Sequence, residues 1–435
     1  MHRFALRSAF IVFVFLASGR YFAMGMADVP QSHDSAATQF RAIQAELGSS
    51  LERKDNRSYL HNAIKLNELL NGAPRTWLVL ASAKLQNGDK DGAVDALDRF
   101  LTMGQVDESV LTSPDFAALR EQPRFVSISE RMARNRASVK TGSIAITVPD
   151  SDLLAEDIDY DVAGRRFFVT SVLKKKIVTL DAEGRLEDFV QSPDGWPMMA
   201  VRVDRPRGVL WVTAAAMQGF AFAPQADWGK SSILCYDLKS RKLLHRIDGP
   251  PHASFGDMTL TAAGDVILSD GRRGGIYRAS VKSTQLERLD DGQFISPQTP
   301  AMHPDGRHVF VPDYARGVGL LDLVTKQVKW IAMEGRYALN GTDGLYLHDS
   351  ALVAVQNGTV PERVVVFQLD STLSKVVSER VIERTGDLDP THGVIVGHEF
   401  YYITGSGWAM LDGKGNKRSG VAPISPRIIR ANLGG

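Results

Sequence analysis

The chain has 435 residues, of which 44% are hydrophobic and 23% are charged, and its formal net charge is +1. These values are ordinary for a soluble globular protein, and the charge balance gives no indication of binding to nucleic acid or to an anionic membrane surface. The length exceeds that of one ordinary domain and predicts a second unit beside the main one.

The N-terminus has the pattern of a secretory signal peptide. Arg3 and Arg7 give a basic start, residues 8–19 form an apolar stretch, and residues 25–27 offer a small-x-small cleavage site. We therefore predict a signal peptide over residues 1–27 and an exported protein, periplasmic or secreted. A bilayer span needs about 20 apolar residues, so no stable membrane span is expected; Arg20 interrupts the pattern and leaves an uncleaved anchor as the alternative.

The single cysteine, Cys235, excludes an intrachain disulfide. It lies within an apolar, strand-like run over residues 232–236, where a free thiol ordinarily packs as a small apolar side chain. We predict a buried core thiol.

Residues 36–139 are predicted to be helical and resemble a tetratricopeptide segment. Two helical faces flank a turn at residues 87–88, and the repeat's bulky and small positions are occupied by Trp77, Leu80, Ala81, Gly88, Ala93, Leu97 and Leu101. Such a segment could bind a protein partner in a groove or could cap the following domain. Residues 135–142 are predicted to be a hinge.

Residues 143–435 contain six similar units of short apolar strands. Their first turns recur with a period of about 45 residues, at positions 163–164, 207–208, 263–264, 305–306, 349–350 and 397–398. About four short strands per unit at this spacing predict a mainly β fold, a six-bladed β-propeller. The third strand of every blade except the third is expected to end near an acid, the last one over residues 409–412. Residues 143–148 and 426–430 compete for closure of the sixth blade.

The residues just before each blade's first strand are expected to line the mouth of the central channel. This set contains Glu156, Asp157, Met198, Met199, Gly256, Asp257, Gln298, Thr299, Thr342, Asp343, Thr391 and His392. Convergent oxygen ligands in a concave site suit a hard divalent cation. The alternative is that the acids are solvated or paired with Arg and Lys, and that His392 is hydrogen-bonded within the structure.

The spacing Asp157-x-Asp159-x-Asp161 is similar to the start of a calcium-binding EF-hand loop. The glycine and the final glutamate of such a loop are not at the required positions. Alternation of polar and apolar residues predicts a strand here instead.

Residues 156–169, 256–264, 304–307 and 343–358 resemble the family of senescence marker protein, gluconolactonase and luciferin-regenerating enzyme. The resemblance follows blade order, and residues 390–397 are similar to an exported branch of that family. It implies a six-bladed propeller with one divalent metal at the channel mouth. Carried over by position, the implied ligands are Glu156, Gln298 and Asp343, with Asp343 as ligand or catalytic base.

The match to this family is incomplete at three positions, because Gly256 also stands where the resemblance leads us to expect an asparagine near the metal. Gln298 replaces an asparagine that the resemblance leads us to expect, and Ser254 stands where a substrate-binding arginine is expected. The implied cofactor is a divalent metal, Ca²⁺ first, with Mg²⁺ or Zn²⁺ as alternatives. Asp157, Asp257 and His392 are further candidates at the mouth.

Two functions follow from these residues. The first is a metal-bearing small-molecule site at the channel, a hydrolase of lactones or esters in which loss of Glu156 abolishes metal binding and turnover together. The second is a non-catalytic propeller that binds a ligand or protein, or an envelope scaffold that uses the helical segment.

Overall fold

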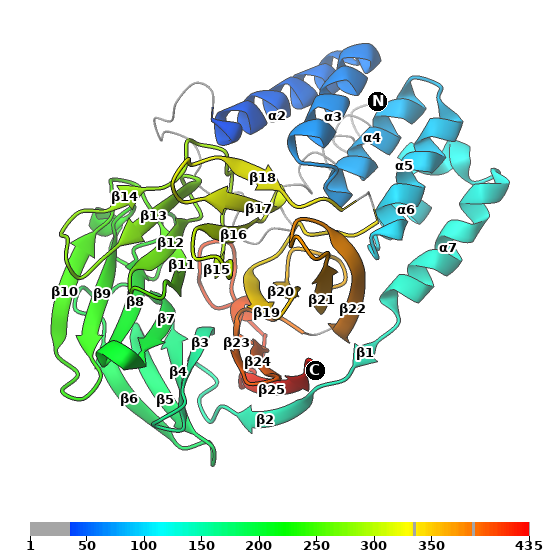
Figure 1. Ribbon diagram of the computed structural model, residues 1–435. Coiled ribbons are helices and arrows are strands. Elements are labelled where there is room, and N and C mark those ends of the chain that lie inside the picture. Colours follow the sequence, from blue (N-terminus) through cyan, green and yellow to red (C-terminus); the bar gives the residue numbers. More distant parts are fainter. Residues whose placement is uncertain (1–34, 334–335, 385–387, 435) are drawn as a thin grey trace.

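The computed structural model describes residues 35–333, 336–384 and 388–434. The predicted signal peptide lies outside these ranges. Within them, no helix has the length and apolar character needed to cross a bilayer. Helices fill the N-terminal part and strands the remainder, and Figure 1 shows the helices along one side of a ring of sheets.

The ring is a six-bladed β-propeller, as the repeats predicted. Blades one to three are built in chain order from β3 (Ala155–Asp161), β4 (Arg166–Ser171), β5 (Lys176–Asp181) and β6 (Leu186–Gln191); β7 (Met198–Asp204), β8 (Val209–Ala215), β9 (Ser231–Asp237) and β10 (Leu243–Asp248); and β11 (Phe255–Leu260), β12 (Val266–Asp270), β13 (Gly275–Ala279) and β14 (Glu287–Arg288). Short 3₁₀ turns lie at Arg205–Arg207 and Gln225–Asp227 in blade two.

Blades four to six follow the same order. Their strands are β15 (Ala301–Met302), β16 (His308–Asp313), β17 (Gly317–Asp322) and β18 (Val328–Trp330); β19 (Gly344–His348), β20 (Ala351–Gln356), β21 (Arg363–Leu369) and β22 (Val376–Arg384); and β23 (Gly393–Val396), β24 (Glu399–Thr404), β25 (Arg427–Asn432) and β2 (Ser143–Thr147). The first strands of neighbouring blades contact one another around the ring, so they are the innermost.

Both chain ends close blade six, which resolves the alternative left open by the sequence. β25 is the third strand and β2, from before blade one, is the outer strand. The third strand expected over residues 409–412 is wrong: Trp408–Met410 is a 3₁₀ turn and Leu411 forms one isolated bridge. β25, with six residues, pairs with β24 along its whole length in the same place in the sheet and buries Ile428 and Ile429.

Hydrophobic cores lie between adjacent blades. Phe168 of blade one packs with Val201 and Leu210 of blade two, and Ile158 of blade one packs with Ile428 of blade six. This is the radial packing that a propeller requires, because one four-stranded blade cannot bury both of its faces by itself. Cys235 is fully buried between blades two and three, as predicted.

The helical part runs from α2 to α7. Its elements are α2 (Ala36–Arg53), α3 (Asn56–Leu69), α4 (Pro74–Gln86), α5 (Lys90–Thr102), α6 (Ser109–Thr112), the 3₁₀ helix η1 (Pro114–Leu119) and α7 (Pro123–Arg136). Asp55 and Asp89 accept a hydrogen bond from the first turn of α3 and α5 respectively, which sets where those helices begin.

The helices are attached to blades four and five. Asn71 donates to the Arg316 carbonyl and Arg316 donates to the Leu69 carbonyl, each at 2.9 Å. The backbone N–H of Val106 donates to Val360 at 2.8 Å. The predicted hinge at residues 135–142 includes β1 (Val139–Lys140), which pairs with β22 as a fifth strand of blade five. The helical segment therefore packs on the propeller through hydrogen bonds at several points.

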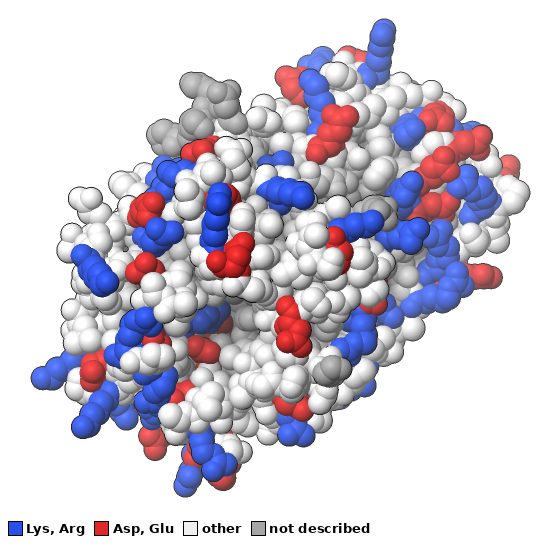
Figure 2. All heavy atoms as spheres, in the orientation of Figure 1, with Lys and Arg blue, Asp and Glu red and all other residues white. Residues whose placement is uncertain are grey.

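Figure 2 shows Lys and Arg interspersed with Asp and Glu over the face of the molecule that it presents. Many of these charges form exposed pairs, for example Lys176 with Asp188 and Arg278 with Glu287.

Candidate functional site

The channel mouth is built on irregularities in the innermost strands. In β3 the pairing partners skip from Ala155 to Ile158, and in β11 from Phe255 to Met258; β7 has the same shift. Each shift places one extra residue in the first strand, which is a β-bulge. Bulges change the direction of side chains locally, so successive residues no longer alternate strictly between faces.

Hydroxyl groups on the second strands hold these bulges. Thr170 accepts from the Asp157 N–H at 2.9 Å and donates to the Met199 carbonyl of the next blade at 3.2 Å. Thr213 occupies the same position in blade two, where it accepts from Ala200 and donates to Gly256 at 2.6 Å. A threonine at the end of the second strand thus joins a bulge to the following blade.

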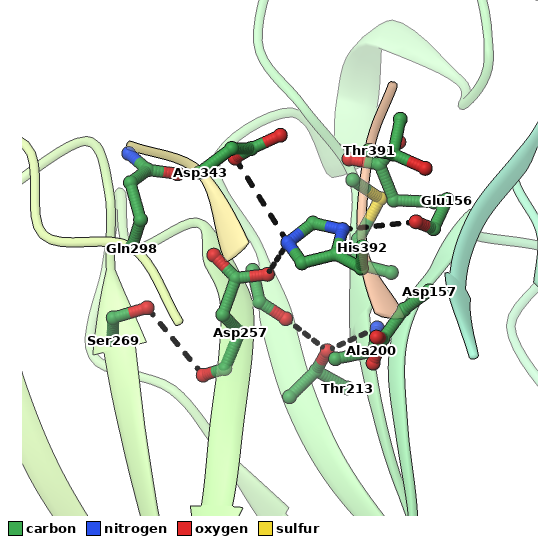
Figure 3. A network of polar contacts seen from close by, with 12 residues as sticks. Glu156, Asp157, Ala200, Thr213, Asp257, Ser269, Gln298, Asp343, Thr391 and His392 are labelled. Atoms are coloured by element: carbon green, nitrogen blue, oxygen red, sulfur yellow. Dashed lines mark hydrogen bonds and ion pairs between the residues drawn. The ribbon is translucent and has the colours of Figure 1, made fainter. Parts of the chain in front are cut away.

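Three side chains from three blades meet at the mouth. The His392 Nε2 lies 3.0 Å from Asp257 Oδ1 and 3.9 Å from Asp343 Oδ1. One ligand atom from each residue lies within 4.8 Å of the others. Figure 3 shows the imidazole between the two carboxylates on one side and Glu156 on the other. His392 is 1% exposed and Asp257 5%, so these groups are shielded from bulk water.

The orientation of the His392 ring is set by the bond that its Nδ1 atom makes. His392 Nδ1 lies 2.9 Å from the backbone carbonyl oxygen of Glu156, an atom that can only accept. Nδ1 therefore carries a proton, and Nε2 faces the channel. Within the described residues, Nε2 has no partner in hydrogen-bonding geometry, although Asp257 is at ion-pair distance. A buried nitrogen in this state is a candidate metal ligand.

The two carboxylates are positioned by their neighbours. Asn357 donates to Asp343 Oδ2 at 2.6 Å and to the Pro390 carbonyl at 3.1 Å, which leaves Asp343 Oδ1 directed at His392. The backbone of Asp257 accepts from the Ser269 hydroxyl at 3.4 Å, as drawn in Figure 3.

Glu156 lies beside this group, and its carboxylate is held by an indole. Trp408 donates to Glu156 Oε2, and the Glu156 side chain is buried. Burial raises the pKa of Glu156 to about 8, His392 works against the shift, and Asp343 adds to it. Burial likewise raises the pKa of Asp343 to about 6, opposed by His392 and increased by Asp257.

The pKa of His392 is also raised, but the cause is different. Burial opposes its charge, but the carboxylates of Asp257 and Asp343 outweigh that effect and raise the pKa of His392 well above its ordinary value. The mouth thus holds an excess of acidic groups in a desolvated place, and protons or a cation must balance them.

Asp157, which the sequence offered as a candidate at the mouth, points elsewhere. Asp157 accepts from the Val201 N–H at 2.8 Å and pairs with Arg202, so it joins blade one to blade two. Asp159 accepts from Val203 in the same way, at 2.6 Å. Asp157-x-Asp159-x-Asp161 is therefore part of a strand, as the alternation predicted, and its acids bind the neighbouring blade.

Gln298 lies close to the mouth, but one of its two polar atoms is already bonded. Its amide nitrogen donates to the Ser296 hydroxyl at 3.0 Å and to the Ser296 carbonyl at 3.2 Å. The polar atom that remains is the carbonyl oxygen, which is the atom a cation would require. Figure 3 places Gln298 beside Asp343.

Sequence reasoning missed Trp408 and the anchoring role of Asn357. Trp408 comes four residues after β24, directly before the run at residues 409–412 that the sequence assigned to a strand. Asn357 comes directly after β20, where polar residues at the end of a second strand could have indicated contact with the mouth.

No family model matches this chain, and no curated protein matches it. Solved structures similar to it include a virginiamycin B lyase from Staphylococcus aureus (14% identity, TM-score 0.45, 59% of this chain and 79% of the other). A gluconolactonase from Xanthomonas campestris matches at 12% identity and a TM-score of 0.45, over 69% and 92%. A luciferin-regenerating enzyme matches at 11% and 0.45, over 69% and 94%. These likenesses concern the fold, and the chemistry has to be argued from the site itself.

Proposed function

We propose that the chain binds a divalent cation at the channel mouth through Asp257, Asp343 and His392 and hydrolyses a lactone or small ester there. The observation that carries the proposal is the bond from His392 Nδ1 to the Glu156 carbonyl, which turns Nε2 toward two carboxylates. In the neutral ring, Nε2 then has its lone pair directed at the place where the carboxylates converge.

The donor set fits a divalent cation in number and charge. Two carboxylates and one neutral imidazole supply three ligands and two negative charges, and further coordination positions stay open for water or substrate. This set differs from the oxygen-only set that the sequence suggested for Ca²⁺. An imidazole among three ligands favours Zn²⁺, whereas Ca²⁺ prefers six to eight oxygens.

Such a cation would polarise the carbonyl group of an ester and lower the pKa of a bound water. Asp343, fixed by Asn357, is placed to accept a proton from the attacking water as its oxygen adds to the carbonyl carbon. Cleavage of the ester C–O bond would then leave a carboxylic acid and an alkoxide; the alkoxide takes the proton held by Asp343 and becomes the alcohol, and the acid loses its own proton to solvent. In a lactone this opens the ring.

An apolar core cluster adjoins the acids, because Trp408, which bonds to Glu156, belongs to it. It is a cluster of buried residues from blades one, two and six, made of Leu154, Val172, Met199, Ala215, Phe220, Phe222, Trp408 and Leu411. The Phe222 and Trp408 rings lie 5.9 Å apart, edge to face. The Ala221 N–H donates to the Lys414 carbonyl at 2.9 Å and joins the two loops that carry these rings. A ligand with an apolar body and one polar carbonyl matches these surroundings.

Export and partner binding belong to the proposal as well. The basic and apolar start of the chain supports a periplasmic or secreted protein, and N-terminal sequencing of the mature protein tests cleavage after Ala27. The hydrogen bonds that join the helical segment to blades four and five support its role as a cap on the propeller.

The test is metal analysis together with a panel of lactones and esters. We expect a stoichiometric divalent ion in the wild-type protein, with loss of both the ion and turnover in His392→Gln and Asp343→Asn. Asp159→Asn is the matched control, because Asp159 is a half-buried carboxylate of an innermost strand, β3, that bonds to blade two. Retained turnover in the two variants contradicts the proposal. Stoichiometric ion without turnover on any substrate favours the non-catalytic alternative.

A further inference from the structure

Two histidines lie close together on the face of the ring opposite the mouth. They are carried by the turns that follow the innermost strands of blades five and six. β19 and β23 each begin at the mouth and run away from it, so the turns that follow them lie at the far end. His348 ends β19, and His398 lies in the turn after β23. Their rings are 5.4 Å apart with an interplanar angle of 84°.

A carboxylate completes this group. Asp349 Oδ2 lies 3.6 Å from His348 Nε2. One ligand atom from each of His348, Asp349 and His398 lies within 4.8 Å of the others. His348 Nε2 is buried and, in the described part of the chain, has no hydrogen-bond partner. An unsatisfied buried nitrogen that faces a second imidazole and a carboxylate needs a physical explanation.

Both turns are held by bonds that do not involve these ligand atoms. Gln368 donates to the Ser350 hydroxyl at 2.7 Å, and the Leu369 N–H donates to the Ser350 carbonyl at 2.9 Å. The Leu433 N–H donates to the backbone carbonyl of His398 at 2.9 Å. The backbone under the site is therefore fixed, while Asp349 and His398 are exposed and can adjust.

From this geometry we propose a second metal site, in which His348, Asp349 and His398 bind a first-row transition cation of the Zn²⁺ type and join blade five to blade six. Imidazole and carboxylate are ligands of Zn²⁺, and an exposed site leaves a fourth position for water. Tetrahedral Zn²⁺ holds its ligand atoms about 3.3 Å apart, so an inward shift of about 1 Å completes the site.

This site is distinct from the channel mouth. The strand β19 separates His348 from Asp343, and five residues at about 3.3 Å each span roughly 16 Å. The proposal therefore goes beyond the proposed function and does not depend on it.

A similar cluster in blade four has its atoms occupied. His303 Nδ1 accepts from the Asp305 N–H at 3.3 Å. Asp305 accepts from the backbone of Arg307 and His308 at 2.9 Å each and bonds to the His308 ring at 2.6 Å. These bonds close a turn, which accounts for the cluster without a metal. This cluster therefore serves as an internal comparison.

The test is equilibrium dialysis of the full-length mature protein, stripped of metal, against Zn²⁺. We expect His398→Gln and Asp349→Asn to lose one bound Zn²⁺ per chain, or to weaken its binding at least tenfold, an effect of about the size that metal-site changes produce. His308→Gln and the control His245→Gln, at a half-buried histidine outside both clusters, should keep it. Asp343→Asn should lose a different Zn²⁺, so the two proposals fail independently.

Copper supplies a second readout, because Cu²⁺ prefers the same donors. The electron paramagnetic resonance spectrum of the Cu²⁺-loaded Asp343→Asn protein should show coupling to two imidazole nitrogens, and His348→Gln in that background should reduce it to one. Unchanged Zn²⁺ stoichiometry in His398→Gln and Asp349→Asn, or loss in His308→Gln instead, overturns the proposal. A spectrum without two-nitrogen coupling also overturns it.

Discussion

Cation binding at the mouth should strengthen as the pH rises from about 6 to 8, because protons and the cation compete for the same groups. At pH 7 a carboxyl with a pKa of about 8, such as Glu156, is roughly nine-tenths protonated, and one with a pKa of about 6, such as Asp343, is roughly nine-tenths ionised. His392, whose pKa is raised by its carboxylate neighbours, holds a proton as well. A cation on Nε2 displaces that proton and also favours ionisation of Glu156.

The size of the change in cation affinity with pH follows from the number of protons that binding releases. Binding should release between about one and two protons near pH 7, and each released proton raises the affinity about tenfold per pH unit, or about 1.4 kcal/mol. Titration calorimetry in buffers of different ionisation enthalpy measures this number. The His398→Gln background removes the second site from the measurement.

His392→Gln is the decisive variant in this experiment. It should not bind the cation at the concentrations that saturate the parent protein; the weak binding that remains at higher cation concentration should release about one proton fewer and depend less on pH, whereas Asp159→Asn should behave like the parent. An affinity that is independent of pH across this range refutes the reasoning. Equal proton release by the parent and His392→Gln refutes it as well.

Three further predictions concern stability. Trp408→Phe should lower the free energy of unfolding by about 1–3 kcal/mol in urea titrations, because Glu156 loses its buried donor; an unchanged midpoint contradicts this. Asp157→Asn should cost about 3–5 kcal/mol, because Arg202 is left without its charged partner, but the bound metal should be retained; loss of metal from a folded variant would make Asp157 a ligand. Arg316→Ala should speed proteolysis within the helical segment while the propeller stays intact; cleavage at the parent's rate would show that this contact does not hold the helices.

The fold could be predicted from the sequence because each blade repeats the same local pattern. Apolar strands with turns at a regular period require no knowledge of long-range contacts. The closure of blade six could not be decided from the sequence, because β2 precedes blade one and β25 ends blade six, nearly 300 residues apart along the chain. The apolar residues at 409–411 gave a competing signal, and only the sheet itself shows that β25 takes that place.

The sequence could predict where the candidate residues lie along the strands, but not where their side chains point. Asp257, Asp343 and His392 lie at the starts of innermost strands, as expected, and the structure brings them together. Glu156 and Asp157 are adjacent in the same bulge, yet one carboxylate bonds to Trp408 and the other to blade two. Periodicity cannot assign such directions, because a bulge interrupts the alternation on which periodicity depends.

The bond between His392 and the Glu156 carbonyl connects this chemistry to the closure of the ring. It joins blade six to blade one, which are the two blades that come from distant parts of the chain. The Thr391 hydroxyl donates to the Ala155 carbonyl at 3.4 Å across the same boundary. Closure therefore sets the tautomer of the imidazole: when blade six is in place, the proton is on Nδ1 and Nε2 faces the acids. A propeller whose last blade is displaced would keep Asp257 and Asp343 near each other but lose the nitrogen ligand, so metal affinity should report on ring closure as well as on the ligands themselves.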